Sequence, residues 1–268
     1  MFDALDIQLE EIDDWNCCGA TSYMGVDEIK AFGLAARNIG LANRQKKTQD
    51  DEETHIIAPC SACYLVLLKT QKYLATHTDV RNSIQGGLSE IDLDLNSNIK
   101  IRHPLDVLVN DIGYQKIAER VQKPLKNVKV ASYYGCQIIR PYQEFDKEYY
   151  PMTMDHLVTK LGGEAVDWPL KTRCCGGTLM GTMQDVGLQI NYRLLKEAHR
   201  RNADVMITTC PLCQFNLECY QDKIMKSHND SVEMPVIYFT QLMGMAFGLS
   251  DISLGLNRLL TPVSDIFQ

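Results

Sequence analysis

A cysteine pattern that occurs nearly twice constrains the fold of this 268-residue chain more than any other feature. The C-terminal half carries five cysteines of the pattern, at Cys136, Cys174, Cys175, Cys210 and Cys213. The N-terminal half carries four of them, at Cys17, Cys18, Cys60 and Cys63. Each version contains a Cys-Cys-Gly triplet followed by a Cys-x-x-Cys pair, and only Cys219 stands apart. Thiols clustered in this way indicate metal binding, redox chemistry or both.

The similarity between the halves extends beyond the cysteines. Apolar, strand-like runs at 56–58 and 205–207 precede the two Cys-x-x-Cys pairs. A repeat of this length is far too long for a solenoid, so the sequence predicts two tandem domains, at 1–122 and 128–268. Cys136 lies 38 positions before Cys174, and the same offset from Cys17 falls before residue 1. We therefore expect the first repeat to lack its opening strand, cysteine and helix, as a misassigned start codon could cause.

Composition narrows the class of protein. A net charge of −7 argues against general nucleic-acid binding. The N-terminus is acidic and has no apolar signal segment, and no run is long and apolar enough to span a bilayer. Ten cysteines without a secretion signal indicate the reducing cytoplasm, where clustered thiols are metal ligands or catalytic groups more often than disulfides. We expect a cytoplasmic protein that reaches a membrane only through partners.

The pattern of apolar residues predicts an α/β fold in which mainly parallel strands alternate with flanking helices. Strands are expected at 7–12, 55–58, 128–133, 165–168, 204–208 and 236–239. Helices are expected at 26–45, 64–74, 104–121, 152–161, 180–202 and 213–225, and again from Gln241. The polar stretch 76–98 is expected to be a loop or insertion, and 123–127 to link the domains. Each cysteine group then follows a strand, at the sheet edge where open α/β folds bind ligands.

Three kinds of site could use these cysteines. Structural zinc needs four tetrahedral ligands, whereas the complete repeat offers five and includes an adjacent pair, Cys174 and Cys175. Thioredoxin-like exchange would use a Cys-x-x-Cys that opens a helix, because the helix dipole lowers a thiol pKa, but it would leave the other cysteines without a role. Iron–sulfur clusters take thiolate ligands. Five cysteines are one more than the four ligands of a simple iron–sulfur cluster. This favours an unusual cluster, or a cluster beside a reactive thiol.

The longer motifs resemble those of the Cys-Cys-Gly domain family, and the whole chain is similar to the B subunit of heterodisulfide reductase. The segments that carry this resemblance are 14–20, 58–64, 133–136, 174–177, 210–214 and 235–242. A double motif of this length is specific, whereas a single Cys-x-x-Cys would not be.

The resemblance implies an oxidoreductase subunit that acts on sulfur groups at noncubane [4Fe–4S] clusters. One cluster would use Cys136, Cys174, Cys175, Cys210 and Cys213. A second would use Cys17, Cys18, Cys60 and Cys63, if its missing fifth cysteine is supplied from upstream. A disulfide or sulfur-carrier substrate would be cleaved by two electrons, or formed in the reverse direction. The implied partners are a ferredoxin-like [4Fe–4S] subunit and a flavin subunit.

Two other functions remain open. Similar domains serve as electron-transfer or membrane-docking subunits of complexes like succinate dehydrogenase/fumarate reductase or glycolate/lactate oxidase, and a zinc-bound assembly module is the third possibility. Four side chains near the Cys-Cys pairs add local expectations. Trp15 and Trp168 are expected to pack beneath the loops, and Lys171 and Arg173 either offset thiolate charge or face solvent.

Overall fold

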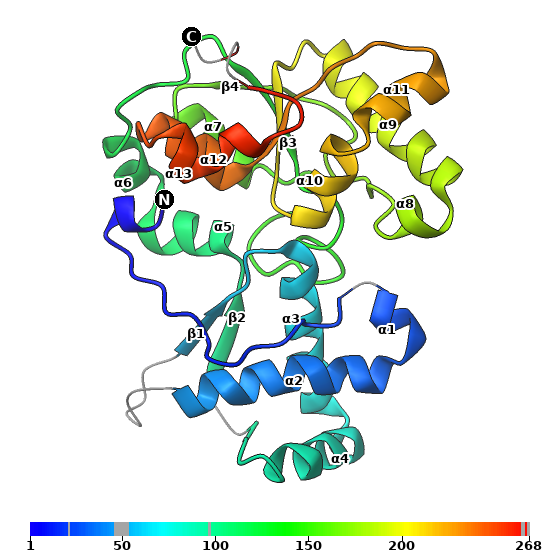
Figure 1. Cartoon of the computed structure of the whole chain (residues 1–268). Helices are drawn as coiled ribbons and strands as arrows, with labels where there is room; N and C mark the ends of the chain where they lie inside the picture. The colour runs from blue at the N-terminus through cyan, green and yellow to red at the C-terminus, as the bar shows by residue number, and fades with distance from the viewer. Residues whose placement is uncertain (21, 46–53, 96–97, 264–265, 267–268) are drawn as a thin grey trace. The chain divides into compact units, whose positions relative to one another are not determined.

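The chain folds into two compact units in the computed structural model, which describes residues 1–20, 22–45, 54–95, 98–263 and 266. The C-terminal unit comprises Met1–Gln8 and Leu105–Gln268, and the N-terminal unit comprises Leu9–Pro104 (Figure 1). These bounds differ from the predicted division at 1–122 and 128–268. The segment predicted to link the domains, 123–127, lies inside the C-terminal unit, because Leu125 is buried in its core together with Leu105 and Leu108.

The C-terminal unit is built on a four-stranded sheet. Its strands are β3 (Lys129–Tyr133), β4 (Glu164–Ala165), β5 (Val205–Thr208) and β6 (Val236–Tyr238). They lie in the order β4-β3-β5-β6, and every pairing is parallel, as the alternation of strands and helices predicts. Ala131 lies opposite Met206, and Ile207 lies opposite Ile237. The carboxyl ends of β3 and β5 therefore meet at one edge.

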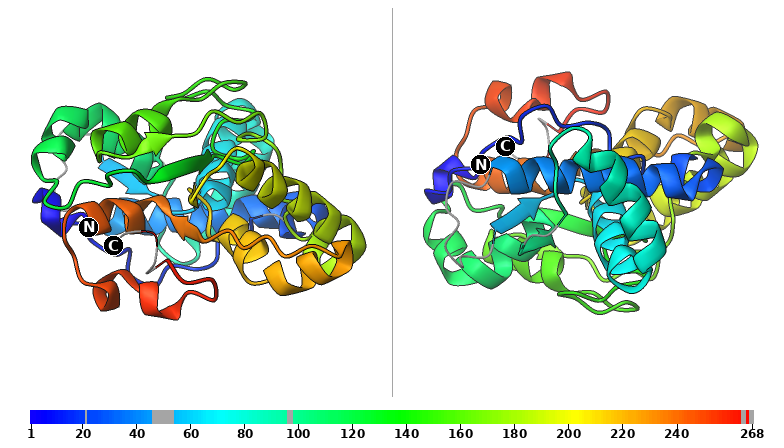
Figure 2. Two further views of the ribbon diagram at one scale, coloured as in Figure 1. Left: turned by 90° about the horizontal axis from the view of Figure 1, so that it is seen from above. Right: turned by 90° about the horizontal axis from the view of Figure 1, so that it is seen from below.

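The helices of the C-terminal unit surround this sheet. The first part of the unit contains α5 (Pro104–Val107), which begins at the unit boundary, a π-helical turn (Leu108–Ile112), α6 (Tyr114–Glu119) and α7 (Thr153–Lys160). The second part contains α8 (Leu179–Thr182), α9 (Gln184–Arg200), α10 (Pro211–Glu218), α11 (Gln221–His228), α12 (Phe239–Ala246) and α13 (Asp251–Leu254). Helices α9 and α11 lie side by side (Figure 2), where Tyr192 stacks on His228.

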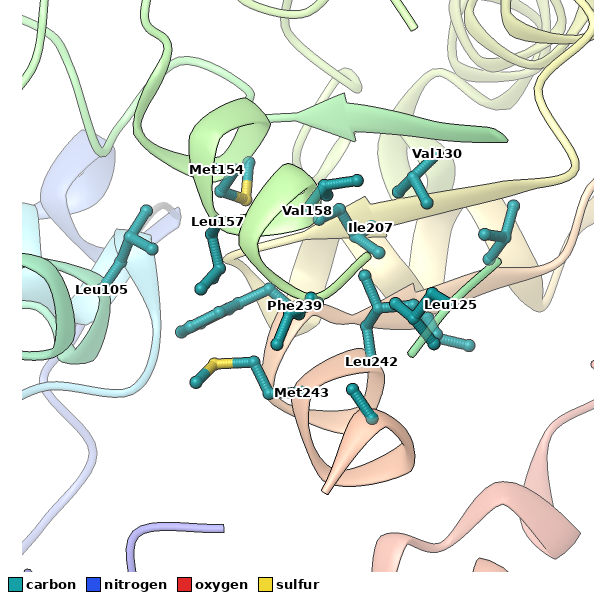
Figure 3. Close-up of a cluster of buried hydrophobic side chains, with 14 of the residues drawn as sticks. Leu105, Leu125, Val130, Met154, Leu157, Val158, Ile207, Phe239, Leu242 and Met243 are labelled. Carbon is teal, nitrogen blue, oxygen red and sulfur yellow. The ribbon is translucent and has the colours of Figure 1, made fainter. Parts of the chain in front are cut away.

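Burial of apolar side chains holds this unit together. Leu157 and Val158 from α7 and Leu242 and Met243 from α12 lie within one cluster (Figure 3). Ile207 of β5 belongs to the same cluster, as do the other residues that Figure 3 labels. Each such side chain contributes about 1.5–3 kcal/mol when fully buried. This core keeps the sheet in register and so fixes the loops at its carboxyl edge.

One long predicted helix, 180–202, is divided in the structure. Met183 leaves the helical region, with φ −136° and ψ 67°, and separates α8 from α9. Gly187 allows α8 to fold back, since a Cβ there would lie 2.5 Å from the Met180 Sδ. The buried face of α9 therefore contains Leu188 and Leu195, while Val186 is 42% exposed. The predicted helix at 213–225 is likewise two helices, α10 and α11.

The N-terminal unit has a smaller sheet. Strands β1 (Thr54–Ile57) and β2 (Ile99–Arg102) pair in parallel. The helices are α1 (Ser22–Val26), α2 (Glu28–Gln45), α3 (Ser61–Thr76) and α4 (Thr78–Ser89). Strand β1 precedes its Cys-x-x-Cys as β5 does in the other unit. The internal duplication is thus visible in the fold.

The predicted strand at 7–12 is wrong, because the described residues of this segment form no strand. Its counterpart in the complete repeat is β4, which pairs only with β3. The first repeat has no counterpart of β3 among its described residues, so the segment has no neighbour with which to form a ladder. An extended segment without a ladder leaves its backbone groups unpaired, and such groups seek water or side chains instead.

The predicted loop at 76–98 is also wrong over much of its length, because it contains α4. Two adjacent glycines, Gly86 and Gly87, lower the helix propensity by about 1 kcal/mol each relative to alanine. Burial of Ile84 and Leu88 beside Phe32 of α2 offsets this cost. Tertiary packing here overrides the local preference.

Candidate metal centre

The five cysteines of the repeated pattern in the C-terminal unit all follow strands of its sheet. Cys136 comes just after β3, while Cys174 and Cys175 lie in the loop that follows β4. Cys210 is the N-cap residue of α10, directly after β5, and Cys213 lies in the first turn of that helix. Because neighbouring parallel strands end at the same edge, residues far apart in sequence meet there.

The side chains form a continuous series of neighbouring thiols. The Cys175 and Cys213 Sγ atoms are 3.4 Å apart. Cys136 lies close enough to Cys174, Cys174 to Cys175, and Cys213 to Cys210 for the two thiols of each pair to affect each other's pKa. Cys175, Cys210 and Cys213 are buried, whereas Cys174 is exposed. The cluster therefore has a buried base and an open side.

The thiols share protons unequally. The hydrogen bond from Cys136 lowers the pKa of Cys174, and the same contact raises the pKa of Cys136. The Arg140 guanidinium contributes to both, since it lowers the pKa of each thiol by its charge. Five adjacent thiolates would repel one another strongly unless cations lay among them. The donor set therefore suits a positively charged metal group with soft, sulfur-seeking ions.

Two buried asparagines hold the loop that carries Cys175. The Asn191 Nδ2 of α9 donates to the Cys175 carbonyl at 2.9 Å and to the Gly187 carbonyl at 2.8 Å. The Asn216 Nδ2 of α10 donates to the Gly177 carbonyl at 2.8 Å and lies 3.5 Å from the Cys175 Sγ. The sequence analysis did not identify either residue. The position of Asn216, three residues after Cys213 and so on the same side of a helix, is a signal that could have found it.

Glycine and tyrosine complete the base of the cluster. Gly135 adopts φ +67°, and a Cβ there would lie 3.4 Å from the Cys213 Sγ. Tyr133 is fully buried and donates its hydroxyl proton to the Arg173 carbonyl at 2.7 Å. Burial, together with the charge of nearby thiolates, raises the pKa of Tyr133 well above its usual value. Tyr133 thus remains a neutral donor that fixes the Arg173 backbone beside Cys174.

The N-terminal unit brings its four cysteines into a similar group. The Cys18 and Cys63 Sγ atoms are 2.7 Å apart. Cys17 lies close enough to Cys18 to lower the pKa of that thiol, and Cys60 lies close enough to Cys63 to raise the pKa of Cys63. The contact with Cys63 lowers the pKa of Cys18 to about 7, against the opposing effect of burial. This unit therefore offers four sulfur donors where the other offers five.

Asn38 of α2 holds the N-terminal Cys-Cys loop. Its Nδ2 donates to the Asn16 carbonyl at 2.8 Å, and its Oδ1 accepts from the Asn16 backbone N–H at 3.0 Å. Arg37 donates to the Asp14 carbonyl at 2.7 Å. Asn38 thus anchors the residue that precedes Cys17, much as Asn191 anchors Cys175. Both units use a buried asparagine on the helix after the triplet.

The predictions for the four side chains near the Cys-Cys pairs are confirmed only in part. Trp168 is buried and donates to the Ser132 carbonyl at 3.1 Å, as predicted, but Trp15 is 58% exposed and does not pack beneath its loop. Lys171 does not serve the thiolates, because it is buried in an ion pair with Asp155 at 2.8 Å. Arg173 is exposed. The cation that acts on the cluster thiols is instead Arg140, which the sequence analysis missed.

The described residues contain no group of three or more His, Cys, Asp or Glu side chains arranged to hold a metal ion. The thiols instead form pairwise contacts, and what each unit offers is a set of donors. In the parts of the chain that the structure describes, no helix combines the length and the apolar character needed to cross a membrane.

Comparison with known proteins identifies a matching family and several similar proteins. The family model of the cysteine-rich CCG domain matches residues 1–68 and 130–218. The chain is 29% identical to the membrane anchor subunit of the 8-methylmenaquinol:fumarate reductase of Wolinella succinogenes, over 95% of this chain and 86% of that protein. It is 27% identical to the B subunit of the ferredoxin:CoB-CoM heterodisulfide reductase of Methanosarcina mazei, over 95% of this chain and 84% of that protein.

A solved structure supports the fold. The crystal structure of a hypothetical protein from Helicobacter pylori superposes with a TM-score of 0.73 at 17% sequence identity. The alignment covers 93% of this chain and 45% of that chain, so the present chain spans less than half of that protein. At this level of identity the likeness concerns the fold alone.

Proposed function

This chain belongs to the family of cysteine-rich CCG domains, and from that premise we propose that it is the iron–sulfur subunit of a heterodisulfide-reductase-like complex. In this role it catalyses the two-electron cleavage of a disulfide or sulfur-carrier substrate, or the reverse oxidation. In the reductive direction one S–S bond breaks, and two electrons and two protons produce two thiols. Relatives named as B subunits of heterodisulfide reductases, or as similar to them, support this assignment and come from several organisms.

The continuous series of five cysteine sulfurs in the C-terminal unit is the observation that carries the proposal. A structural zinc ion needs four ligands, so five thiols around one site exceed what zinc uses. Thiol–disulfide exchange needs two. Cys136, Cys174, Cys175, Cys210 and Cys213 would together hold a noncubane [4Fe–4S] cluster. Such a cluster supplies iron sites that bind substrate sulfur and electrons that are delivered one at a time.

The chain's own residues prepare this site in three ways. Burial of Cys210 and Cys213 excludes water from the base of the cluster. Arg140 offsets part of the thiolate charge, and its NH2 donates to the Thr172 carbonyl at 2.6 Å, which holds the guanidinium near the loop. The exposed Cys174 marks the open side. We propose that substrate approaches this side.

The N-terminal unit would hold a second cluster through Cys17, Cys18, Cys60 and Cys63. Four thiolates suffice for an ordinary [4Fe–4S] cluster, whereas the noncubane form of the other unit uses a fifth. We propose that the two units correspond to the predicted tandem domains, apart from the segments 1–8 and 105–122, which belong to the C-terminal unit, and that each holds a cluster of its own.

Partners would supply the electrons. A substrate that takes two electrons needs a donor, and we propose a ferredoxin-like [4Fe–4S] subunit, itself fed by a flavin subunit. The complex would lie in the cytoplasm and meet a membrane only through these partners.

A second function has its own support in the relative named as a membrane anchor subunit of a fumarate reductase. In that role the chain would pass electrons within a complex, or dock it to a membrane, and would cleave no disulfide. Cleavage of a disulfide by a pair of clusters needs the cysteine groups of both units. Electron transfer or docking needs the cysteine group of one unit at most. The two functions therefore make different predictions for variants of the N-terminal cysteines.

Iron and acid-labile sulfide content after anaerobic purification tests the proposal first. We expect about four irons per chain if the C-terminal unit alone is loaded and about eight if both are. Cys213→Ser should lower the content by about one cluster, while Cys219→Ser, which removes the cysteine outside both groups, should leave it unchanged. Zinc in place of iron would refute the iron–sulfur role.

Electron paramagnetic resonance separates the two functions. Addition of a thiol under mild oxidation should give a new signal if substrate sulfur binds at the cluster. Cys18→Ser should abolish disulfide cleavage while leaving iron in the C-terminal unit. Intact iron with no thiol-dependent signal in the unaltered chain would favour the electron-transfer function.

A further inference from the structure

The buried side-chain amide of Asn216 interacts directly with a cluster cysteine, and nothing described so far requires this contact. Its Nδ2 lies 2.8 Å from the Gly177 carbonyl, 3.5 Å from the Cys175 carbonyl and 3.5 Å from the Cys175 Sγ. The residue is 1% exposed, so water does not compete for these bonds. An amide nitrogen carries two N–H donors.

The hydrogen bond of Asn191 affects which acceptor the second N–H of Asn216 uses. One N–H of Asn216 is used by the Gly177 carbonyl, which is its shortest contact. The Cys175 carbonyl already accepts from Asn191 at the shorter distance of 2.9 Å. The Cys175 sulfur, which carries negative charge as a thiolate, is therefore the stronger acceptor for the second N–H of Asn216. We infer that Asn216 is a positioning residue that donates an N–H···S hydrogen bond to Cys175 and thereby raises the reduction potential of the C-terminal cluster.

The sign follows from charge. Reduction adds an electron, part of whose density is carried by the sulfur ligands. A hydrogen bond to sulfur stabilises this more negative state, and hydrogen bonds of this kind are among the factors that set cluster potentials. Low polarity around a buried bond strengthens the effect. Loss of the donor therefore makes the cluster harder to reduce.

The internal duplication supplies a natural contrast. Val66 lies three residues after Cys63, as Asn216 lies three residues after Cys213, and it is also buried. A valine side chain has no N–H to donate. The cluster of the N-terminal unit therefore lacks this contribution to its reduction potential.

Redox titration of the full chain, followed by electron paramagnetic resonance, tests the inference. We expect Asn216→Leu, which keeps the approximate shape but removes both donors, to shift the midpoint potential of one cluster to a more negative value. Asn191→Leu is the matched control, because it removes an equally buried amide that bonds the Cys175 carbonyl and not its sulfur. It should lower thermal stability without a comparable shift. Equal shifts in both variants, or no shift in Asn216→Leu, would overturn the inference.

A second variant guards against misfolding. Asn216→Val introduces the residue that the N-terminal unit carries at the corresponding position, Val66, and a valine side chain has no N–H to give, so it too should shift the potential downward. An unchanged potential in this variant would also overturn the inference. Because the inference rests on the proposed iron–sulfur role, iron content is measured on the same samples. An unaltered chain without iron would refute that role, whereas bound iron with unmoved potentials would refute the inference alone.

Discussion

Lys171 and Asp155 form an ion pair whose removal should destabilise the C-terminal unit strongly. The Lys171 Nζ and the Asp155 Oδ1 are 2.8 Å apart, and each side chain is 3% exposed. The Tyr134 hydroxyl donates to the other carboxylate oxygen at 2.8 Å. Replacing Lys171 with methionine, of similar length, would leave a buried carboxylate with this one hydroxyl donor.

Two effects set the expected loss in the free energy of unfolding. Breaking a buried pair by removing one partner costs about 3–5 kcal/mol, against about 0–1 kcal/mol for an exposed pair. Proton uptake caps this penalty, because neutralising an ordinary aspartate at pH 7 costs about 4 kcal/mol and removes the unpaired charge. We therefore expect Lys171→Met to lower the free energy of unfolding by about 3–4 kcal/mol at pH 7. The deficit should shrink by about 1.4 kcal/mol for each pH unit below 7, since protonation becomes easier.

Urea unfolding of the reduced, metal-free chain measures this quantity. The protein has two tryptophans, and exchange of the exposed Trp15 for phenylalanine leaves the buried Trp168 as a reporter of the C-terminal unit. Lys196→Met makes the same chemical change at a lysine that pairs with Asp230 on the surface of that unit, and it should alter unfolding little.

Two outcomes of the unfolding experiment would contradict the expected role of this ion pair. A loss below about 1 kcal/mol for Lys171→Met would mean that the pair behaves as a surface pair. A deficit that does not change between pH 7 and pH 5 would mean that no unpaired carboxylate is created. The double variant Lys171→Met with Asp155→Leu should recover part of the stability, because it removes the stranded charge.

Three further predictions use single side chains. Gly135→Ala should cost about 1 kcal/mol or more and reduce iron retention, because φ is +67° there and the new Cβ would touch Cys213; calorimetry and iron analysis check this. Gly187→Ala should cost about 1–3 kcal/mol in the same assay, since its Cβ would overlap Met180. Burial raises the pKa of Glu218, so wild-type stability from this group is complete below pH 4.5 and falls as pH rises above it. Glu218→Gln should remove this decrease in stability and should unfold at a higher temperature than the wild type at pH 7. The same dependence of stability on pH in both proteins would contradict this.

Much of the fold could be predicted from the sequence because its signals are local. The apolar runs that became β3, β5 and β6 are short and bounded, and the cysteines that follow them were expected at the strand ends. Parallel pairing follows once strands alternate with helices. The grouping of Cys136, Cys175 and Cys213 at one edge is a direct consequence.

The failures of prediction all depend on partners that are distant in sequence. The segment 7–12 has the pattern of a strand, yet it lacks the neighbour that β3 provides to β4. Helix α4 forms despite two glycines because Ile84 and Leu88 are buried.

The number, type and spacing of the thiols set which sulfur donors this chain offers, and hydrophobic periodicity sets its α/β class. The tertiary structure alone decided which polar side chains serve those thiols. Lys171 stands close to Cys174 in sequence but pairs with Asp155, whereas Asn216 and Arg140 reach the cysteines from other elements. The position of a residue in the sequence determines only which loop it belongs to. Burial then decides its partner, because a charged or polar group removed from water must bond with the complementary group that the fold brings within reach.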